Sequence, residues 1–274
     1  MNTILANTLV IFLFMCVMFV IALVKKNNSI VDIGWGLGFV VVALFSFFIK
    51  PLHSGGSDTS QMIITLLVVL WGLRLSVHLL VRNWGQPEDW RYAKWRIEWG
   101  KNVMVRSFFQ VFMLQGVFML IVLLPVFLAN SSFESRKLLW GIPVLVLYLA
   151  GLLVWMVGFF FQSVSDYQLL KFKRNPLNKG KVMRYGLWKY SRHPNYFGEA
   201  TMWWGVFMLS LISCFSLGGA VLRLLGPVTI TFLLLKVSGV VMLEKKYSGN
   251  PEYEDYQKKT SSFLPCPPRK EDEL

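Results

Sequence analysis

Long apolar runs alternate with shorter polar segments along the whole chain. A helix of about 20 apolar residues is long enough to cross the hydrocarbon core of a bilayer. Runs of about that length occupy approximately 4–24, 32–50, 61–81, 107–129, 138–161, 195–214 and 219–242. The pattern therefore predicts an all-α fold, a polytopic integral membrane bundle of about seven transmembrane helices.

The composition agrees with a membrane protein and narrows the chemistry. Of the 274 residues, 55% are hydrophobic and 16% are charged, whereas a soluble domain has about 25% charged residues. The three cysteines lie far apart, without a CxxC pair or a Cys/His cluster. Neither a disulfide framework nor a metal site is expected from that spacing.

The formal net charge of +13 is distributed unevenly between the polar segments. Of the 28 Lys and Arg residues, 22 follow the first, third, fifth and seventh runs. The positive-inside rule then predicts an N-terminus outside and a C-terminus in the cytoplasm. The positive charge is thus explained by topology, and no nucleic-acid partner is expected. The membrane would be a bacterial inner membrane or the ER membrane, which share this orientation toward the cytosol.

Several polar residues lie inside the predicted spans, where an ionisable group is a functional-site hypothesis by default. Asp32 opens the second span. Trp71, Arg74 and His78 are spaced i, i+3 and i+7, so they share one face of the third. We expect Asp32, Arg74 and His78 to line a catalytic pocket that opens toward the cytoplasm. In the alternative, Asp32 forms a structural ion pair with Arg74 or Lys236, and His78 is a core residue.

The segment between the fifth and sixth spans carries the densest polar chemistry. Eight Lys and Arg residues lie between 171 and 192, and they are followed by Pro194 of "SRHPNYFGE" (191–199), which is placed to begin a helix. A helix N-terminus facing a basic loop is suited to an anion. Asp166 and Glu199 add acceptors for ribose hydroxyls, an amide or an adenine amine. This mixture favours a nucleotide; a lipid headgroup, the alternative, would need only the basic part.

The motifs "SDYQLLKF", "NKGKVMRYGLW", "GLWKYSRHPNYFGE" and "PEYEDYQKKTSSFLPCPP" lie within residues 155–266. Together they resemble the C-terminal membrane domain of steroid 5α-reductases and sterol reductases, above all the bacterial-type proteins described only as steroid-reductase-like. The likeness to isoprenylcysteine carboxyl methyltransferases is more distant. The resemblance implies NADPH bound from the cytoplasmic side, with contacts from Gln162, Asp166, Arg184, Arg192, His193, Asn195, Tyr196, Glu199 and Tyr247.

The resemblance also implies that two parts of a single membrane domain, 1–274, bind the substrate and the cofactor. Residues 1–130 would form the substrate side. Residues 138–274, with the loop 162–194 and the tail 243–274, would bind the cofactor. The substrate side departs from steroid 5α-reductases, because it lacks their Gln-Glu pair, and the third span has no Tyr on its polar face.

The function expected from this reading is NADPH-dependent reduction of a C=C bond in a lipophilic substrate, such as a steroid-like or other lipid enone. Asp32 or His78 would supply the proton. The partners would be that small molecule and the bilayer, and the protein would be a monomer or a weak homo-oligomer. One alternative is an S-adenosylmethionine-dependent membrane methyltransferase, with Glu199 and His193 holding the cofactor. Another is a non-catalytic lipid-binding membrane protein.

Overall fold

The computed structural model describes residues 3–49, 59–131, 138–139, 142–214 and 216–269. These residues are helical except for a two-residue antiparallel ladder, β1 (Leu138–Leu139) with β2 (Ile142–Pro143), and the connecting loops. The chain divides into two compact units. Unit 1 comprises Met1–Val144 and Ser210–Gly226, and unit 2 comprises Leu145–Leu209 and Pro227–Leu274.

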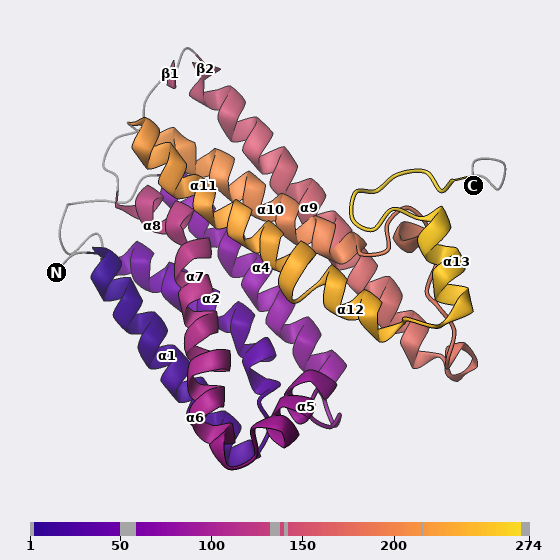
Figure 1. Cartoon of the computed structure of the whole chain (residues 1–274). Helices are drawn as coiled ribbons and strands as arrows, with labels where there is room; N and C mark the ends of the chain where they lie inside the picture. Colours follow the sequence, from indigo (N-terminus) through magenta and orange to yellow (C-terminus); the bar gives the residue numbers. More distant parts are fainter. Residues whose placement is uncertain (1–2, 50–58, 132–137, 140–141, 215, 270–274) are drawn as a thin grey trace. The chain divides into compact units, whose positions relative to one another are not determined.

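Unit 1 begins with three long helices, α1 (Thr3–Lys25), α2 (Ile30–Ile49) and α4 (Thr59–Asn83) (Figure 1). Glycines let α2 and α4 approach until their backbones touch. A Cβ at Gly36 would lie 2.4 Å from the Gly72 carbonyl oxygen, and one at Gly72 would lie 2.6 Å from that of Gly36. Small residues at such a crossing are the usual means of close helix packing in membranes.

The second half of unit 1 is a nearly continuous series of short helical elements. They are α5 (Trp90–Trp99), η1 (Gly100–Asn102), α6 (Val103–Ser107), the π-helical turn η2 (Phe108–Met113), α7 (Leu114–Val122) and α8 (Leu124–Asn130). Asp89 caps α5 by accepting a hydrogen bond from the Arg91 amide at 3.0 Å. Large apolar side chains from these elements and the long helices form the core, among them Phe39, Trp71, Phe112 and Phe127.

Unit 2 is built on two long helices, α9 (Val144–Arg174) and α10 (Pro194–Ser210). Its remaining elements are η3 (Pro176–Asn178), η4 (Gly186–Lys189), η6 (Leu233–Val237), α12 (Val240–Lys246) and α13 (Pro251–Lys259). A further turn, η5 (Leu211–Ser213), belongs to unit 1, and α11 (Leu217–Phe232) contributes residues to both units. Pro194 begins α10, as the sequence predicts.

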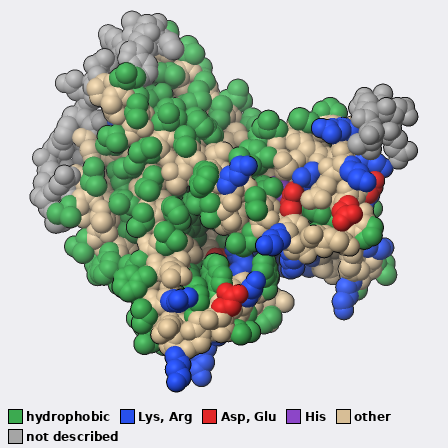
Figure 2. All heavy atoms as spheres, in the orientation of Figure 1, with side chains coloured by type: hydrophobic (Ala, Val, Ile, Leu, Met, Phe, Trp, Pro, Cys, Tyr) green, Lys and Arg blue, Asp and Glu red, His purple; other side chains and the backbone are tan. Residues whose placement is uncertain are grey.

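Among the residues that the structure describes, six helical segments are long and apolar enough to cross a membrane, as expected for an integral membrane protein. They are Thr3–Lys25, Ile30–Ile49, Thr59–Asn83, Trp90–Val122, Val144–Arg174 and Leu217–Lys246. The remaining predicted span, 195–214, corresponds to α10, which has 17 residues and is shorter than these. Figure 2 shows hydrophobic side chains over much of the visible face. The orientation of the chain in the membrane stays a prediction.

Candidate functional site

The candidate site in unit 2 depends on a close approach of α9 and α10. A Cβ at Gly158 would lie 2.5 Å from the Met202 amide nitrogen, and one at Gly198 would lie 2.4 Å from the Gln162 amide nitrogen. Any side chain at either glycine would therefore push the two backbones apart. The contact brings the polar face of α9 at 162–166 against the first turns of α10.

Four polar side chains meet across this contact in two amide–carboxylate pairs. Gln162 Nε2 donates to Glu199 Oε2 at 3.0 Å, and Asn195 Nδ2 donates to Asp166 Oδ1 at 3.1 Å. The two residues from each helix lie four positions apart, so each helix presents both on one face. We call these four residues, Gln162, Asp166, Asn195 and Glu199, the amide–carboxylate ladder.

The ladder has acceptor capacity that the protein does not use. Gln162 Oε1 and Asn195 Oδ1 are buried, and within the described part of the chain neither has a hydrogen-bond partner. Ionised carboxylates only accept hydrogen bonds. A ligand with N–H or O–H donors, such as an amide or the hydroxyls of a ribose, would complete these bonds. The residues present therefore fit the amide and ribose parts of NADPH.

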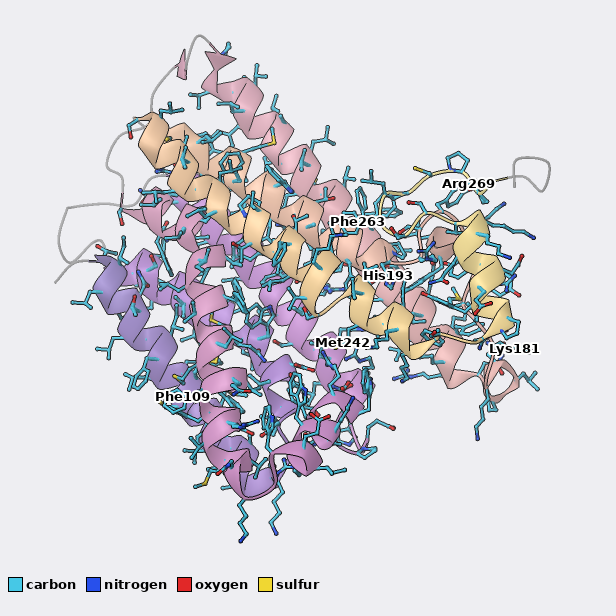
Figure 3. All side chains as sticks on the ribbon, viewed as in Figure 1. Phe109, Lys181, His193, Met242, Phe263 and Arg269 are labelled. Atoms are coloured by element: carbon cyan, nitrogen blue, oxygen red, sulfur yellow. The ribbon has the colours of Figure 1, made fainter. Side chains whose placement is uncertain are left out.

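Arg192 and His193 hold the C-terminal tail against the start of α10. Arg192 Nε donates to Glu244 Oε1 at 2.8 Å, and its Nη1 donates to the carbonyls of Gln257 and Thr260. His193 Nε2 lies 3.2 Å from the same Glu244 oxygen. Their side chains are only 10% and 5% exposed. Figure 3 shows His193 near the tail residue Phe263, whose carbonyl accepts from the Ser191 hydroxyl at 2.8 Å.

The other predicted cofactor contacts also have partners within unit 2. Arg184 forms ion pairs with Asp255 and Glu252 at 3.3 and 3.4 Å. Tyr196 stacks on His193 with ring centroids 5.4 Å apart, and Tyr247 stacks on Tyr253 at 4.7 Å. These contacts mean that the predicted phosphate-binding cations are engaged by carboxylates of the same chain.

Tyr256 is a further link between the tail and the loop. Its hydroxyl donates to the carbonyls of Trp188 and Ser191. Burial raises the pKa of the Tyr256 hydroxyl, and the neighbouring Tyr253 adds to the increase. Trp188 in turn donates through Nε1 to the Ser165 carbonyl on α9 at 3.1 Å. The loop and the tail are thus hydrogen-bonded to the helix that carries half of the ladder.

In unit 1, Asp32 is bound by two residues of α5. Arg91 Nη2 lies 2.9 Å from Asp32 Oδ2, and the Tyr92 hydroxyl donates to Asp32 Oδ1 at 2.6 Å. The structure thus gives Asp32 an ion pair with Arg91, a residue that the sequence did not single out. The alternative pairing with Arg74 or Lys236 stays a prediction. Arg74 and His78 are half-buried on α4. Their part in a catalytic pocket stays a prediction.

A set of polar contacts fixes α5 beside the loop between α1 and α2. Glu88 accepts from the Asn28 amide at 2.6 Å and pairs with Arg96 at 2.8 Å. The Asp89 amide donates to the Ser29 hydroxyl at 2.6 Å. Burial raises the pKa of Glu88, but the hydrogen bonds from Arg96 and Asn28 outweigh it, so the pKa is lowered overall. These contacts position Arg91 and Tyr92 at Asp32.

Sequence reasoning missed three of the residues that define these arrangements: Arg91, Tyr92 and Glu244. The first two lie in a segment with recurring tryptophans, which is typical of an interfacial aromatic belt. Glu244 follows an apolar run and lies 52 positions beyond Arg192. A carboxylate directly after an apolar run was a usable signal for Glu244. The pairing itself is a long-range contact that no local pattern predicts.

The chain belongs to the family described as "Protein of unknown function (DUF1295)", which matches residues 18–260. It is 34% identical over 76 residues to steroid 5-alpha-reductase DET2 of Gossypium hirsutum, covering 28% of each chain. It is 31% identical over 121 residues to 3-oxo-5-alpha-steroid 4-dehydrogenase 1 of Rattus norvegicus, covering 43% of this chain and 41% of the relative. The matches span less than half of both reductases, so their similarity to this chain is distant and partial.

A third relative matches over a longer stretch. It is an uncharacterized protein of Schizosaccharomyces pombe, 25% identical over 259 residues, which cover 88% of this chain and 73% of the relative. No solved structure matches the chain at a significant level. The expected likeness to the steroid reductases is confirmed, and the family carries no assigned activity.

Proposed function

We propose that the protein is an NADPH-dependent reductase of a C=C bond in a lipophilic substrate, such as a steroid-like or other lipid enone. The observation that carries the proposal is the amide–carboxylate ladder. It gathers buried acceptors on two helices that are in backbone contact. The partial similarity to two steroid reductases supports the same class of reaction. When bound, NADPH supplies the hydride.

The ladder would hold the donor-bearing parts of the cofactor, which are the carboxamide and the ribose hydroxyls. Gln162 Oε1 and Asn195 Oδ1 offer neutral acceptors, and the carboxylates of Asp166 and Glu199 can each accept more than one hydrogen bond. Hydrogen bonds to ionised acceptors are the stronger kind. Arg184, Arg192 and His193 would act by holding the loop and tail around the site, because carboxylates of the tail already engage them.

Unit 1 contains the candidate proton donors. The Tyr92 hydroxyl donates to Asp32, which also pairs with Arg91, so these contacts hold the Tyr92 hydroxyl in a defined position. The Tyr–carboxylate pair thereby adds Tyr92 to the predicted acids Asp32 and His78. The substitution Tyr92→Phe removes the hydroxyl with its proton and keeps an aromatic ring of nearly the same size.

Cofactor binding is tested by titrating the detergent-purified protein with NADPH and following quenching of tryptophan fluorescence. We expect saturable binding that weakens at least tenfold in Glu199→Ala and in Asn195→Ala. Ser163→Ala and Thr201→Val are matched controls, because they lie on the same two helices outside the ladder; both should bind NADPH as the unaltered protein does. Absence of NADPH binding to the unaltered protein would contradict the proposal.

The methyltransferase alternative has one observation in its favour. S-adenosylmethionine carries an amino group, an adenine amine and ribose hydroxyls, all donors that would also suit the ladder. Its distinguishing property is that it has no phosphates. Titration with S-adenosylmethionine therefore decides between them: saturable binding of it, without NADPH binding, would replace the reductase by a methyltransferase.

The proton donor is tested by turnover rather than by binding. NADPH oxidation is followed at saturating cofactor with a 3-oxo-4-ene steroid as the probe substrate. If these residues serve in proton transfer and not in cofactor binding, Tyr92→Phe, Asp32→Asn and His78→Ala should each bind NADPH as the unaltered protein does. A fall in turnover of about a hundredfold or more in one of them identifies the acid. Undiminished turnover in all three would refute these assignments.

A further inference from the structure

Unit 1 contains a buried cluster of neutral polar side chains that the proposed reaction does not use. It consists of Asn7 on α1, Ser46 in the last turn of α2 and Asn130 at the end of α8. Their exposed fractions are 0%, 0% and 1%. We call these three residues the asparagine–serine cluster. It connects three helices that Figure 1 shows gathered in unit 1.

The hydrogen bonds within the cluster are long. Asn7 Nδ2 and Asn130 Nδ2 both donate to Ser46 Oγ, at 3.5 and 3.4 Å. Most N–H···O bonds in proteins are about 2.7–3.2 Å long. Because Ser46 accepts from both amides, its own hydroxyl proton is available to a further acceptor. Both asparagine amides thus lie at the long limit of hydrogen-bonding distance from the same Ser46 oxygen.

The cluster has an imbalance of donors and acceptors. Asn7 Oδ1 and Asn130 Oδ1 are both buried and have no hydrogen-bond partner among the residues that the structure describes. Turning either amide by half a rotation exchanges its oxygen and nitrogen but leaves one of its atoms unmatched. The single Ser46 proton cannot satisfy two carbonyl oxygens. Two acceptors and one donor are thus left for a ligand.

We propose that the asparagine–serine cluster is a binding site for one water molecule. Water supplies two donors for the asparagine oxygens and one acceptor for the Ser46 hydroxyl, which matches the unmet groups. An alcohol has a single O–H donor and would leave one oxygen unmatched. Buried waters in proteins typically make about three hydrogen bonds to such groups. Because an unsatisfied buried acceptor is destabilising, the bridge stabilises the junction of the three helices.

A sodium ion fits the same residues less well. A cation cannot accept the Ser46 proton, and the cluster has no carboxylate. The carbonyl of Leu128, two positions before Asn130, already accepts from the Arg223 guanidinium at 3.2 Å. The end of α8 that carries Asn130 thus already contacts one buried positive charge, and burying a second in the same unit is unfavourable in a medium of low dielectric.

The direct test is a density map of the detergent-purified protein at a resolution that shows ordered water. We expect an isolated peak within about 3.2 Å of both asparagine side chains and Ser46 Oγ. A peak continuous with an elongated density would show a lipid alcohol instead and would overturn the assignment. A closed cluster, with Asn7 and Asn130 bonded directly to other side chains and no peak, would also overturn it.

A second measurement follows magnetisation transfer from water to the side-chain amide protons of Asn7 and Asn130 by NMR. Transfer should be present in the unaltered protein and lost in Ser46→Val, which fills the space that the water occupies. Ser46→Ala removes only the hydroxyl and serves if the valine variant does not fold; it should reduce the transfer. Transfer that is absent from the unaltered protein would refute the proposal.

Sodium is distinguished by thermal unfolding in sodium chloride and in choline chloride at the same ionic strength. For a water site we expect the same unfolding midpoint in both salts. A saturable rise of the midpoint in sodium, abolished in Asn130→Leu, would show a cation site and overturn the water assignment. None of these measurements depends on the reductase proposal.

Discussion

The approach of α9 and α10 at Gly198 can be tested with a single added methyl group. In Gly198→Ala the new Cβ would lie 2.4 Å from the Gln162 amide nitrogen and 2.5 Å from the Gly158 carbonyl oxygen. Both neighbours are backbone atoms, so no side-chain rotation can relieve the contact. The two helices must therefore move apart at this point.

The required movement can be worked out from the structure. Ordinary van der Waals contact begins at 3.4 Å, so the backbones must separate by about 1 Å. The Gln162–Glu199 hydrogen bond, now 3.0 Å long, would be stretched to about 4 Å and lost. Overpacking costs about 1–3 kcal/mol of stability. We also expect NADPH binding to weaken about tenfold or more, because each factor of ten corresponds to about 1.4 kcal/mol.

The assay is NADPH titration by tryptophan fluorescence, together with the thermal unfolding midpoint in detergent. Gly218→Ala is the matched control, since a Cβ there would have no atom within 4 Å and the position is also helical. It should bind NADPH normally and have an equal or slightly higher midpoint, because Ala is favoured over Gly in helices. Normal NADPH binding in Gly198→Ala would refute the view that this contact sets up the ladder.

Three further changes test contacts outside the ladder. Arg192→Ala leaves the carboxylate of Glu244 without its closest ion pair and should destabilise the protein by about 3 kcal/mol. We expect faster proteolysis of the tail, and an unchanged rate of proteolysis would contradict the tail contact. Glu88 has a lowered pKa, so its stabilising effect is present above its ordinary pKa of 4.5 and is lost as the pH falls through the lowered value. Below pH 4.5, the unfolding midpoint of Glu88→Gln should therefore depend less on pH than that of the unaltered protein. The same pH profile in both proteins would contradict a stabilising role of the Glu88 carboxylate. Tyr256→Phe removes a buried hydrogen-bond donor from two carbonyls and should lower the free energy of unfolding in urea by about 1–3 kcal/mol. An unchanged free energy of unfolding would show that the hydroxyl is not needed.

The fold could be predicted from the sequence wherever it depends on local pattern. Apolar runs of about 20 residues mark the long helices directly, as in α1, α2 and α4. Residues 138–139 and 142–143, at the start of the predicted span 138–161, form the β1–β2 ladder instead, and α5 and α13 lie outside the predicted spans. The limits of the long helices are less well predicted. The fifth apolar run ends near residue 161, yet α9 continues to Arg174. Within this extension, Gln162 and Asp166 pair with side chains of α10, which a single-helix pattern does not reveal.

Part of the candidate site could also be predicted from local sequence pattern. The four-residue spacing in Gln162/Asp166 and in Asn195/Glu199 places each pair on one helix face. The cross-pairing depends on Gly158 and Gly198, whose importance appears only when the helices are brought together. The partner of Asp32 is 59 positions away in sequence, and a charge count could not choose between Arg91 and Arg74.

The engagement of Arg184 and Arg192 changes the chemical character of the candidate site. Judged from the sequence alone, the basic residues of the loop before α10 indicate a binding site for phosphates. In the structure, tail carboxylates pair with both arginines, while the ladder between the helices retains unmatched acceptors. Under the proposed function, the ladder would select donor groups such as an amide or a diol. A lipid phosphate alone would leave these acceptors unmatched, so the ladder favours a nucleotide cofactor over a headgroup as the ligand of unit 2.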